Sequence, residues 1–140
     1  MNAFIWAMLA SVVWGFVPIL EKLGLKDVKP MSGLFYRCAG VAIGLILLSI
    51  VLVKPAEIKA VGIRSACLLM LAGFLASFVA QIFFYNGLKL GEVSRIVPIS
   101  ASYPLMTFLL GVWLLGESWS FVKLGGVVLI VAGMWLLRIG

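Results

Sequence analysis

The chain contains five apolar segments, and three polar side chains in the third, Ser65–Leu88, have the spacing of a binding surface. Ser77, Gln81 and Tyr85 follow one another at intervals of four residues, so they share one face of an α-helix. Gln81 has both donors and an acceptor to satisfy, and an amide beside an aromatic hydroxyl suits a pocket for a polar ligand. Polar groups inside a membrane usually face the bundle interior or a water-filled cavity. We therefore expect this face to point inward.

Other segments carry similar faces. They comprise Ser11, Trp14, Pro18 and Glu21 on the first expected helix, Tyr36 and Arg37 on the second, and Ser100, Tyr103, Pro104 and Thr107 on the fourth. The competing interpretation is ordinary hydrogen bonding between helices, worth about 0.6 kcal/mol per bond. Because four segments share this pattern, we predict a substrate-binding site made of Trp14, Arg37, Gln81, Tyr85, Ser100 and Tyr103.

The elements that must position these side chains are apolar segments of membrane-spanning length. The five segments are Ala3–Leu20, Met31–Val53, Ser65–Leu88, Ile96–Gly116 and Phe121–Leu137. Their only charged residues are Arg37 and Lys123. A span needs about 20 apolar residues, and a helix pairs its own backbone polar groups in lipid. The sequence thus predicts an all-α membrane protein with five transmembrane helices, at about 3–22, 31–53, 64–88, 93–116 and 120–138. They form a single domain over residues 1–140.

Composition supports this class and argues against others. Hydrophobic residues make up 64% of the chain and the mean hydropathy is +1.24, far above soluble domains. The net charge of +6 does not indicate nucleic-acid binding, because the basic residues lie mostly in connections, next to lipid headgroups. The longest connection, Lys54–Arg64, has eleven residues, which leaves no room for a catalytic domain. We therefore expect no enzyme activity and no catalytic residues.

Metal and cofactor chemistry has little support. Histidine is absent, and the two cysteines, Cys38 and Cys67, lie in apolar segments without a metal-binding or redox spacing. We expect no metal site and no cofactor.

The first segment lacks the basic start and the cleavage site of a signal peptide. It is therefore expected to be a retained span.

The charged and helix-breaking residues give further expectations. Arg37 either reaches the membrane surface or contacts an anionic or carbonyl-rich partner. Glu21 lies near a helix end, so no acidic residue is expected mid-membrane, and proton-coupled antiport of cations is poorly supported. Pro104 is the best candidate for a helix interruption, whereas Pro18 and Pro98 lie near helix ends.

The basic residues give only a weak signal for orientation. Five spans would place Lys54, Lys59, Arg64 and Lys123 on the side of the N-terminus. The opposite side would hold Lys22, Lys26, Lys29, Lys89, Arg95 and Arg138, with Arg37 possible as a seventh. Four against six or seven is a small asymmetry, whereas firmly oriented proteins show a large one. The split is either noise in a small count or the mark of a chain that inserts in both orientations.

Several motifs together resemble the EamA domain of the drug/metabolite transporter superfamily. In the first half they are Trp14-Gly15, Pro18, Lys22, Pro30 and Tyr36-Arg37. In the second half they are Gly87-Leu88-Lys89-Leu90-Gly91-Glu92-Val93-Ser94, Val97-Pro98-Ile99, Tyr103-Pro104-Leu105, Leu114-Leu115-Gly116-Glu117, Lys123-Leu124-Gly125-Gly126 and Ala132-Gly133. Each motif alone is weak. Their combination covers essentially the whole chain and is specific.

The resemblance implies a secondary transporter built from two inverted five-helix repeats. In each repeat the first four helices would line the cavity and the fifth would be peripheral. The sequence holds one such repeat, and it lacks the membrane-embedded Glu of the related small multidrug resistance proteins. Glu117 is a hallmark of the family, and its place in a turn indicates a structural role.

The leading hypothesis is an alternating-access transporter of a small polar or amphipathic metabolite. It would act in the cell (cytoplasmic or inner) membrane as a multi-pass protein. Its expected partners are the small-molecule substrate, the lipid bilayer and a second five-helix unit, either as an antiparallel homodimer or as a heterodimer. The alternatives are a subunit of a lipid-linked sugar flippase and a non-transporting membrane assembly subunit.

Overall fold

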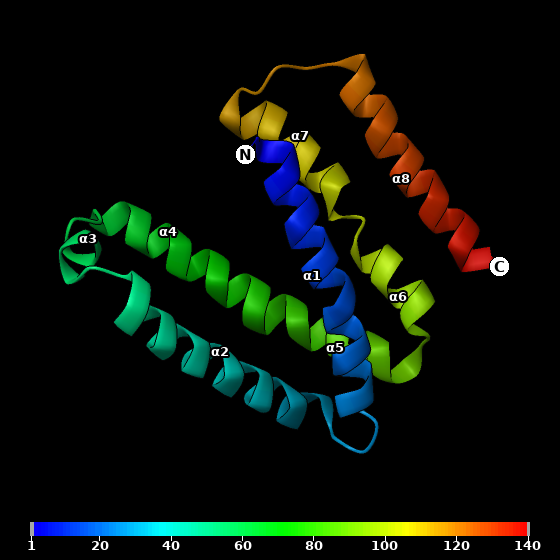
Figure 1. Cartoon of the computed structure of the whole chain (residues 1–140). Helices are drawn as coiled ribbons and strands as arrows, with labels where there is room; N and C mark the ends of the chain where they lie inside the picture. Colours follow the sequence, from blue (N-terminus) through cyan, green and yellow to red (C-terminus); the bar gives the residue numbers. More distant parts are fainter. Residues whose placement is uncertain (1, 140) are drawn as a thin grey trace. The chain divides into compact units, whose positions relative to one another are not determined.

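The structure is a computed structural model that describes residues 2–139. The described residues form helices and the connections between them. The chain divides into two compact units, Met1–Leu90 and Gly91–Gly140. The first unit contains α1 (Ala3–Gly24), α2 (Pro30–Leu52), α3 (Pro55–Lys59), α4 (Ile63–Phe74), the π-helical turn η1 (Leu75–Val79) and α5 (Ala80–Leu90) (Figure 1). The second contains α6 (Val93–Ser100), α7 (Tyr103–Leu115) and α8 (Phe121–Ile139).

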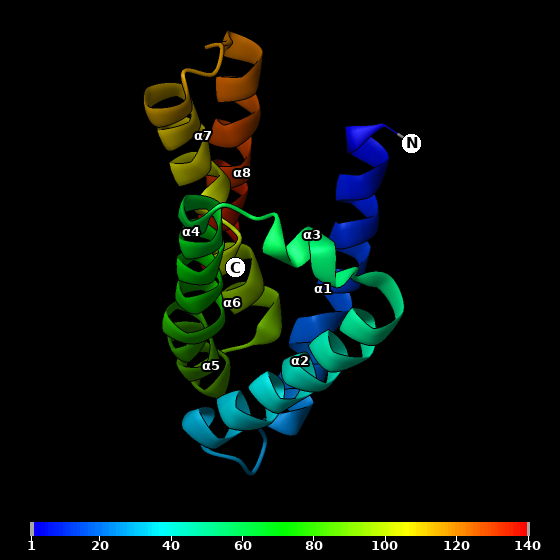
Figure 2. The same ribbon diagram turned by 90° about the vertical axis from the view of Figure 1, so that its left-hand side faces the viewer.

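Local sequence signals explain where the helices of the first unit begin. The side-chain Oδ1 of Asn2 accepts a hydrogen bond from the Ile5 N–H at 3.1 Å, which caps α1. Pro30 and Pro55 open α2 and α3, where a missing N–H costs nothing. Helix α2 packs on α5, and α1 also packs on α5. Figure 2 shows α2 and α4 diverging towards α3, so the tight packing lies at the α5 end.

The buried core of the first unit is small and lies at that packed end. Leu25, Leu34, Tyr85 and Leu88 are its buried hydrophobic residues. A Cβ on Gly33 would stand 2.5 Å from the Leu25 Cδ2 and 3.4 Å from the Tyr85 ring. The missing side chain at Gly33 thus lets α2 approach both residues closely.

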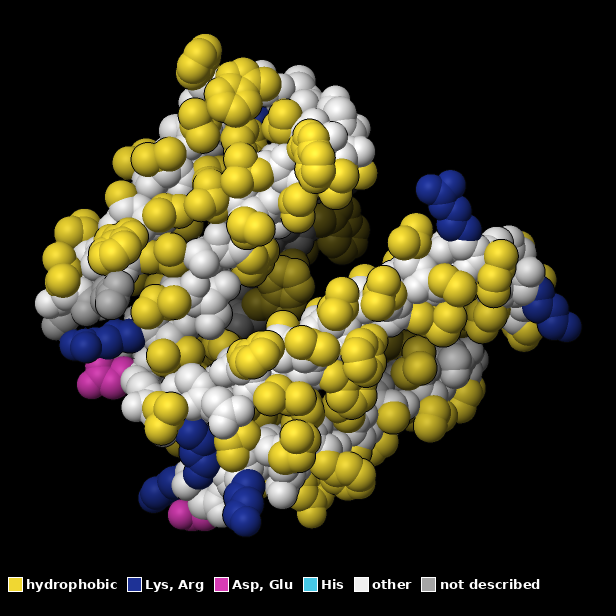
Figure 3. Space-filling view, turned by 180° about the vertical axis from the view of Figure 1, so that it is seen from behind, with side chains coloured by type: hydrophobic (Ala, Val, Ile, Leu, Met, Phe, Trp, Pro, Cys, Tyr) yellow, Lys and Arg dark blue, Asp and Glu magenta, His cyan; other side chains and the backbone are white. Residues whose placement is uncertain are grey.

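Four helices are long and apolar enough to cross a membrane among the described residues. They are Ala3–Gly24, Pro30–Leu52, Ile63–Leu90 and Val93–Leu115, and Phe121–Leu137 is a shorter apolar helix. Figure 3 shows hydrophobic side chains covering the helices of the first unit, with Lys and Arg side chains gathered near the α1–α2 connection and near α3. This is the surface of a membrane protein. The all-α membrane class is confirmed, and the fifth span stays a prediction.

Two expected helices are not regular from end to end. The helix expected over 64–88 contains η1, a turn with one residue more than an α-turn. The helix expected over 93–116 divides into α6 and α7 at Ala101 and Ser102. The cause is Pro104, which has no N–H to donate to Ser100 and would clash with its carbonyl. The interruption expected at Pro104 is therefore confirmed, while Pro18 and Pro98 lie inside continuous helices.

The topology makes a direct prediction for accessibility. With the native cysteines replaced by serine, we expect single cysteines at Lys26, Lys59, Leu90 and Ser118 to label alternately from the two sides of the membrane. Short connections force consecutive spans to run in opposite directions. Membrane-impermeant maleimide labelling of cells before and after permeabilisation measures this. Labelling of positions 26 and 59 from the same side of one inserted population would contradict the assignment.

The end of α7 depends on glycine. Gly116 has φ 66° and ψ 26°, the left-handed conformation that closes a helix, and the Glu117 N–H donates to the Gly111 carbonyl at 3.1 Å. A Cβ atom added to Gly111 would lie 3.3 Å from the Glu117 Oε2. The Glu117 side chain thus folds back over the end of α7, as expected for a structural role.

We expect Gly116→Ala to lower the free energy of unfolding by about 1 kcal/mol, because alanine is strained at positive φ. The matched control is Gly125→Ala, in α8, where an added Cβ has open space. That change should leave stability unchanged or raise it, since alanine favours a helix. Thermal unfolding in detergent, followed by tryptophan fluorescence, measures both. Equal effects would show that the conformation at Gly116 does not matter.

Candidate functional site

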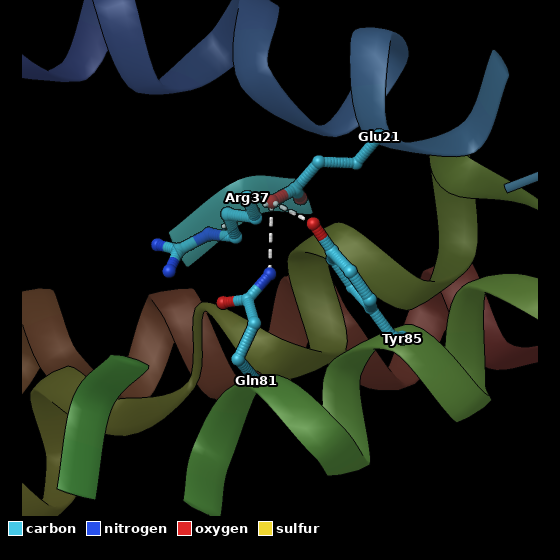
Figure 4. Close-up of polar contacts among 4 residues, drawn as sticks. All are labelled: Glu21, Arg37, Gln81 and Tyr85. Carbon is cyan, nitrogen blue, oxygen red and sulfur yellow. Dashed lines mark hydrogen bonds and ion pairs between the residues drawn. The ribbon is translucent and has the colours of Figure 1, made fainter. Parts of the chain in front are cut away.

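One carboxylate oxygen joins three helices of the first unit. The Glu21 Oε1 on α1 accepts hydrogen bonds from the Gln81 Nε2 at 2.9 Å and from the Tyr85 Oη at 3.0 Å, both on α5. The Arg37 Nε on α2 lies 3.3 Å from the same oxygen. Figure 4 shows the three donors converging on it. We call Glu21, Arg37, Gln81 and Tyr85 the Glu21 cluster.

The Glu21 cluster is largely shielded and its formal charges cancel. The Glu21 side chain is 10% exposed and that of Arg37 is 29% exposed, while Tyr85 is buried. A charge removed from water is tolerated when an opposite charge and hydrogen bonds compensate it. The Nη1 of Arg37 is buried and has no hydrogen-bond partner among the described residues. Arg37 thus contacts an anionic group, the second of the two alternatives, and keeps unused donor capacity.

Local geometry brings the donors to Glu21. Gln81 and Tyr85 are one turn apart on α5 and follow directly after η1. The extra residue in a π-turn rotates all side chains that come after it, relative to an uninterrupted α-helix. The Tyr85 ring is then fixed by close packing near Gly33. The direction of the Gln81–Tyr85 face is therefore set by η1 as well as by the four-residue spacing.

An open cleft of about 470 Å³ adjoins the Glu21 cluster. Glu21, Arg37 and Tyr85 contribute to its wall, together with Tyr36 and apolar residues of α1 such as Val17 and Leu20. A mostly apolar wall with a few converging polar groups is the usual construction of a small-molecule site. The cleft can therefore offer hydrogen bonds and charge at one place and apolar contact elsewhere.

The structure brings together three of the six predicted site residues. Arg37, Gln81 and Tyr85 meet in the Glu21 cluster. Trp14 lies on α1 two turns before Glu21 and is 65% exposed. Ser100 ends α6 and Tyr103 begins α7 in the second unit, both exposed. For Trp14, Ser100 and Tyr103 a role in binding stays a prediction.

Sequence reasoning left Glu21 out of the predicted site because it lies near a helix end. The signal that could have found it was the spacing from Trp14 and Pro18, which places Glu21 on the polar face of α1. Two other polar residues of α5 and η1 stay outside the cluster. Asn86 is exposed and donates to the Ile82 carbonyl at 2.7 Å, and Ser77 lies within η1.

Comparison with known proteins decides the family. The model of the EamA-like transporter family matches residues 1–139. The chain belongs to this family. It is therefore a membrane protein of a transporter family, which points to transport and not to enzyme catalysis.

Relatives in three organisms agree with this placement. An uncharacterized transporter of Archaeoglobus fulgidus is 21% identical over 98% of the chain and 48% of its own length. An uncharacterized transporter of a Sinorhizobium species is 28% identical over 96% of the chain and 94% of its own length. An uncharacterized protein of Methanocaldococcus jannaschii is 27% identical, with 99% and 97% covered. The chain thus spans about half of the first relative and nearly all of the other two. No solved structure matches it.

Proposed function

We propose that this protein is a secondary, alternating-access transporter of a small polar or amphipathic metabolite in the cell (cytoplasmic or inner) membrane. The observation that carries the proposal is the Glu21 cluster beside its cleft. Four polar side chains from three helices converge in a chain that is 64% hydrophobic. Such groups are costly in a membrane and usually mark a substrate pathway. Membership of a transporter family supports the same conclusion.

The substrate site in this proposal begins at the Glu21 cluster and continues along the polar face of α1 towards Trp14. Ser100 and Tyr103, next to the break between α6 and α7, are the other residues that we propose to contact the substrate. Transporters place such helix breaks at their substrate sites, where freed backbone groups can bind the ligand. Helix α8 has no polar side chain between Gly126 and Leu137, so we assign it a peripheral role.

The working unit in this proposal is an antiparallel pair of five-helix units, most simply two copies of this chain. Alternating access requires one repeat to rock against an inverted partner. The near-even split of basic residues suits a chain that inserts in both orientations. The Archaeoglobus relative has as much sequence outside the match as inside it, which is enough for a second unit of similar length. The rival arrangement is a heterodimer with a different five-helix unit whose basic residues favour the opposite orientation.

A stabilisation screen followed by transport tests the proposal. The purified protein is heated with a panel of labelled amino acids, sugars, nucleosides and polyamines, and stabilising compounds are tested for counterflow in proteoliposomes. We expect at least one to stabilise the protein and to be transported. Stabilisation only by a polyprenyl-phosphate lipid would indicate a flippase subunit. Co-purification with a fixed partner and no flux would indicate an assembly subunit.

Variants then locate the site. We expect Gln81→Ala and Tyr103→Ala to lower counterflow at least tenfold without loss of expression, because each removes a polar contact to the substrate. Leu129→Ala and Val131→Ala on α8 are the matched controls and should leave counterflow within twofold of the parent. Loss of transport in the α8 variants with normal transport in the other two would show that the cavity is elsewhere.

A further inference from the structure

A second hollow in the first unit is basic, and the proposed transport function does not use it. It has a volume of about 330 Å³ and lies between the end of α1, the α1–α2 connection and the end of α5. Three lysines, Lys22, Lys26 and Lys89, line it together with three leucines, Leu23, Leu25 and Leu88. We call these six residues the lysine hollow. None of these six residues has a carboxylate side chain.

Backbone contacts fix two of the three ammonium groups. The Lys22 Nζ donates a hydrogen bond to the Leu88 carbonyl near the end of α5. The Lys89 Nζ donates to the Lys26 carbonyl at 3.0 Å. One bond runs from α1 to α5 and the other from α5 to the α1–α2 connection, so they hold the two walls together. An ammonium has three donors, and the bond to Lys26 uses one of those on Lys89.

The lysine hollow lies at the ends of two candidate membrane spans, where headgroups are expected. Its residues are at the end of one candidate span, the end of another and the short connection between α1 and α2. Figure 3 shows Lys and Arg side chains near this connection, next to a surface covered by hydrophobic side chains. Leu23 is 68% exposed. An occupant of the hollow can therefore meet both ammonium groups and exposed apolar surface.

We propose that the lysine hollow binds the phosphate of an anionic phospholipid, with its glycerol and upper acyl chain against Leu23 and the apolar surface beside the hollow. Basic pockets between transmembrane helices suit such headgroups. The exposed side chain of Leu23 favours a lipid over free phosphate, because a small inorganic anion gains nothing from apolar contact. A bound lipid would also bridge α1 and α5, the helices that supply Glu21, Gln81 and Tyr85.

Lipid retention tests the proposal without any transport assay. The purified protein in neutral detergent is titrated with phosphatidylglycerol or phosphatidylcholine, and bound lipid is measured by native mass spectrometry. We expect preferential retention of phosphatidylglycerol. Each lysine near a headgroup contributes about 1 kcal/mol, so Lys26→Ala should weaken this retention roughly fivefold and Lys26→Ala with Lys89→Ala roughly 30-fold.

The matched control is Lys54→Ala with Lys59→Ala, the same loss of charge near α3 and away from the lysine hollow. It should leave retention of phosphatidylglycerol unchanged. Lys26→Ala alone decides the outcome if the double variant unfolds, because it keeps the backbone carbonyl that Lys89 contacts. If both pairs of lysine substitutions weakened retention of phosphatidylglycerol equally, the proposal would be overturned, because the lipid would then respond to the total positive charge and not to the lysine hollow. Equal retention of phosphatidylcholine, or full competition by millimolar inorganic phosphate, would overturn it as well.

Discussion

Replacing Arg37 with methionine should lower the free energy of unfolding by about 1–3 kcal/mol and reduce transport to near background. The change keeps an unbranched side chain as far as the position of Nε and removes the charge, which leaves the shielded Glu21 carboxylate without an opposite charge. Losing one partner of a buried ion pair costs about 3–5 kcal/mol. The expected loss is smaller because Arg37 is 29% exposed, and solvent screens such a pair.

A double-mutant cycle separates charge compensation from simple packing. We expect Glu21→Gln to be less damaging than Arg37→Met, because Arg37 is the more exposed partner and its charge can turn towards water. The combination of Glu21→Gln with Arg37→Met should be more stable than Arg37→Met alone, since no charge is then left unpaired. Thermal unfolding in detergent measures stability, and counterflow of a compound found in the screen measures transport.

The control for this cycle is Arg95→Met. The Arg95 Nε lies 3.6 Å from the Glu92 Oε2, and the two side chains are 47% and 73% exposed. An exposed pair of this kind contributes about 0–1 kcal/mol, so the variant should unfold close to the parent. Equal destabilisation by Arg95→Met and Arg37→Met would contradict a special role for the Glu21 cluster. A double variant no more stable than Arg37→Met would do so too.

The second large effect is expected when the orientation of the chain is fixed. We call a variant with a fixed orientation a locked form. One locked form carries Ala56→Lys and Ala60→Lys with Lys29→Gln and Arg95→Gln. These changes turn the count of basic residues, on the side of the N-terminus against the opposite side, from four against six to six against four. The other carries Leu90→Lys and Ser94→Lys, which gives four against eight. The side with the excess of lysine and arginine stays cytoplasmic. The two forms should therefore insert in opposite orientations.

In the antiparallel arrangement, either locked form alone should transport at near background, and co-expression of both should restore activity. Each form alone lacks the inverted partner that alternating access requires. Single-cysteine labelling at position 118, an uncharged serine, verifies the orientation of each form, and counterflow measures activity. Full transport by one locked form would defeat the antiparallel model. If a different five-helix protein restored transport and the other locked form did not, a heterodimer would be favoured.

The sequence was sufficient to place much of the molecule. Apolar segments of spanning length predict the helices, because lipid leaves the backbone few other ways to pair its polar groups. Pro104 predicts the break between α6 and α7, since its ring cannot follow a continuous helix. The four-residue spacing of Gln81 and Tyr85 predicts their shared face. These features depend on near neighbours in the chain, so composition and spacing encode them.

The tertiary structure alone decided how distant residues meet. It placed the Glu21 carboxylate against Arg37, Gln81 and Tyr85, and it showed η1, which helps to set the direction of the Gln81–Tyr85 face. Near a helix end, a carboxylate can either reach water or bond to neighbouring helices, and the sequence does not distinguish the two. The packing of α1 and α2 on α5 settles the choice for Glu21, because it brings three donors to one oxygen and shields that oxygen from water.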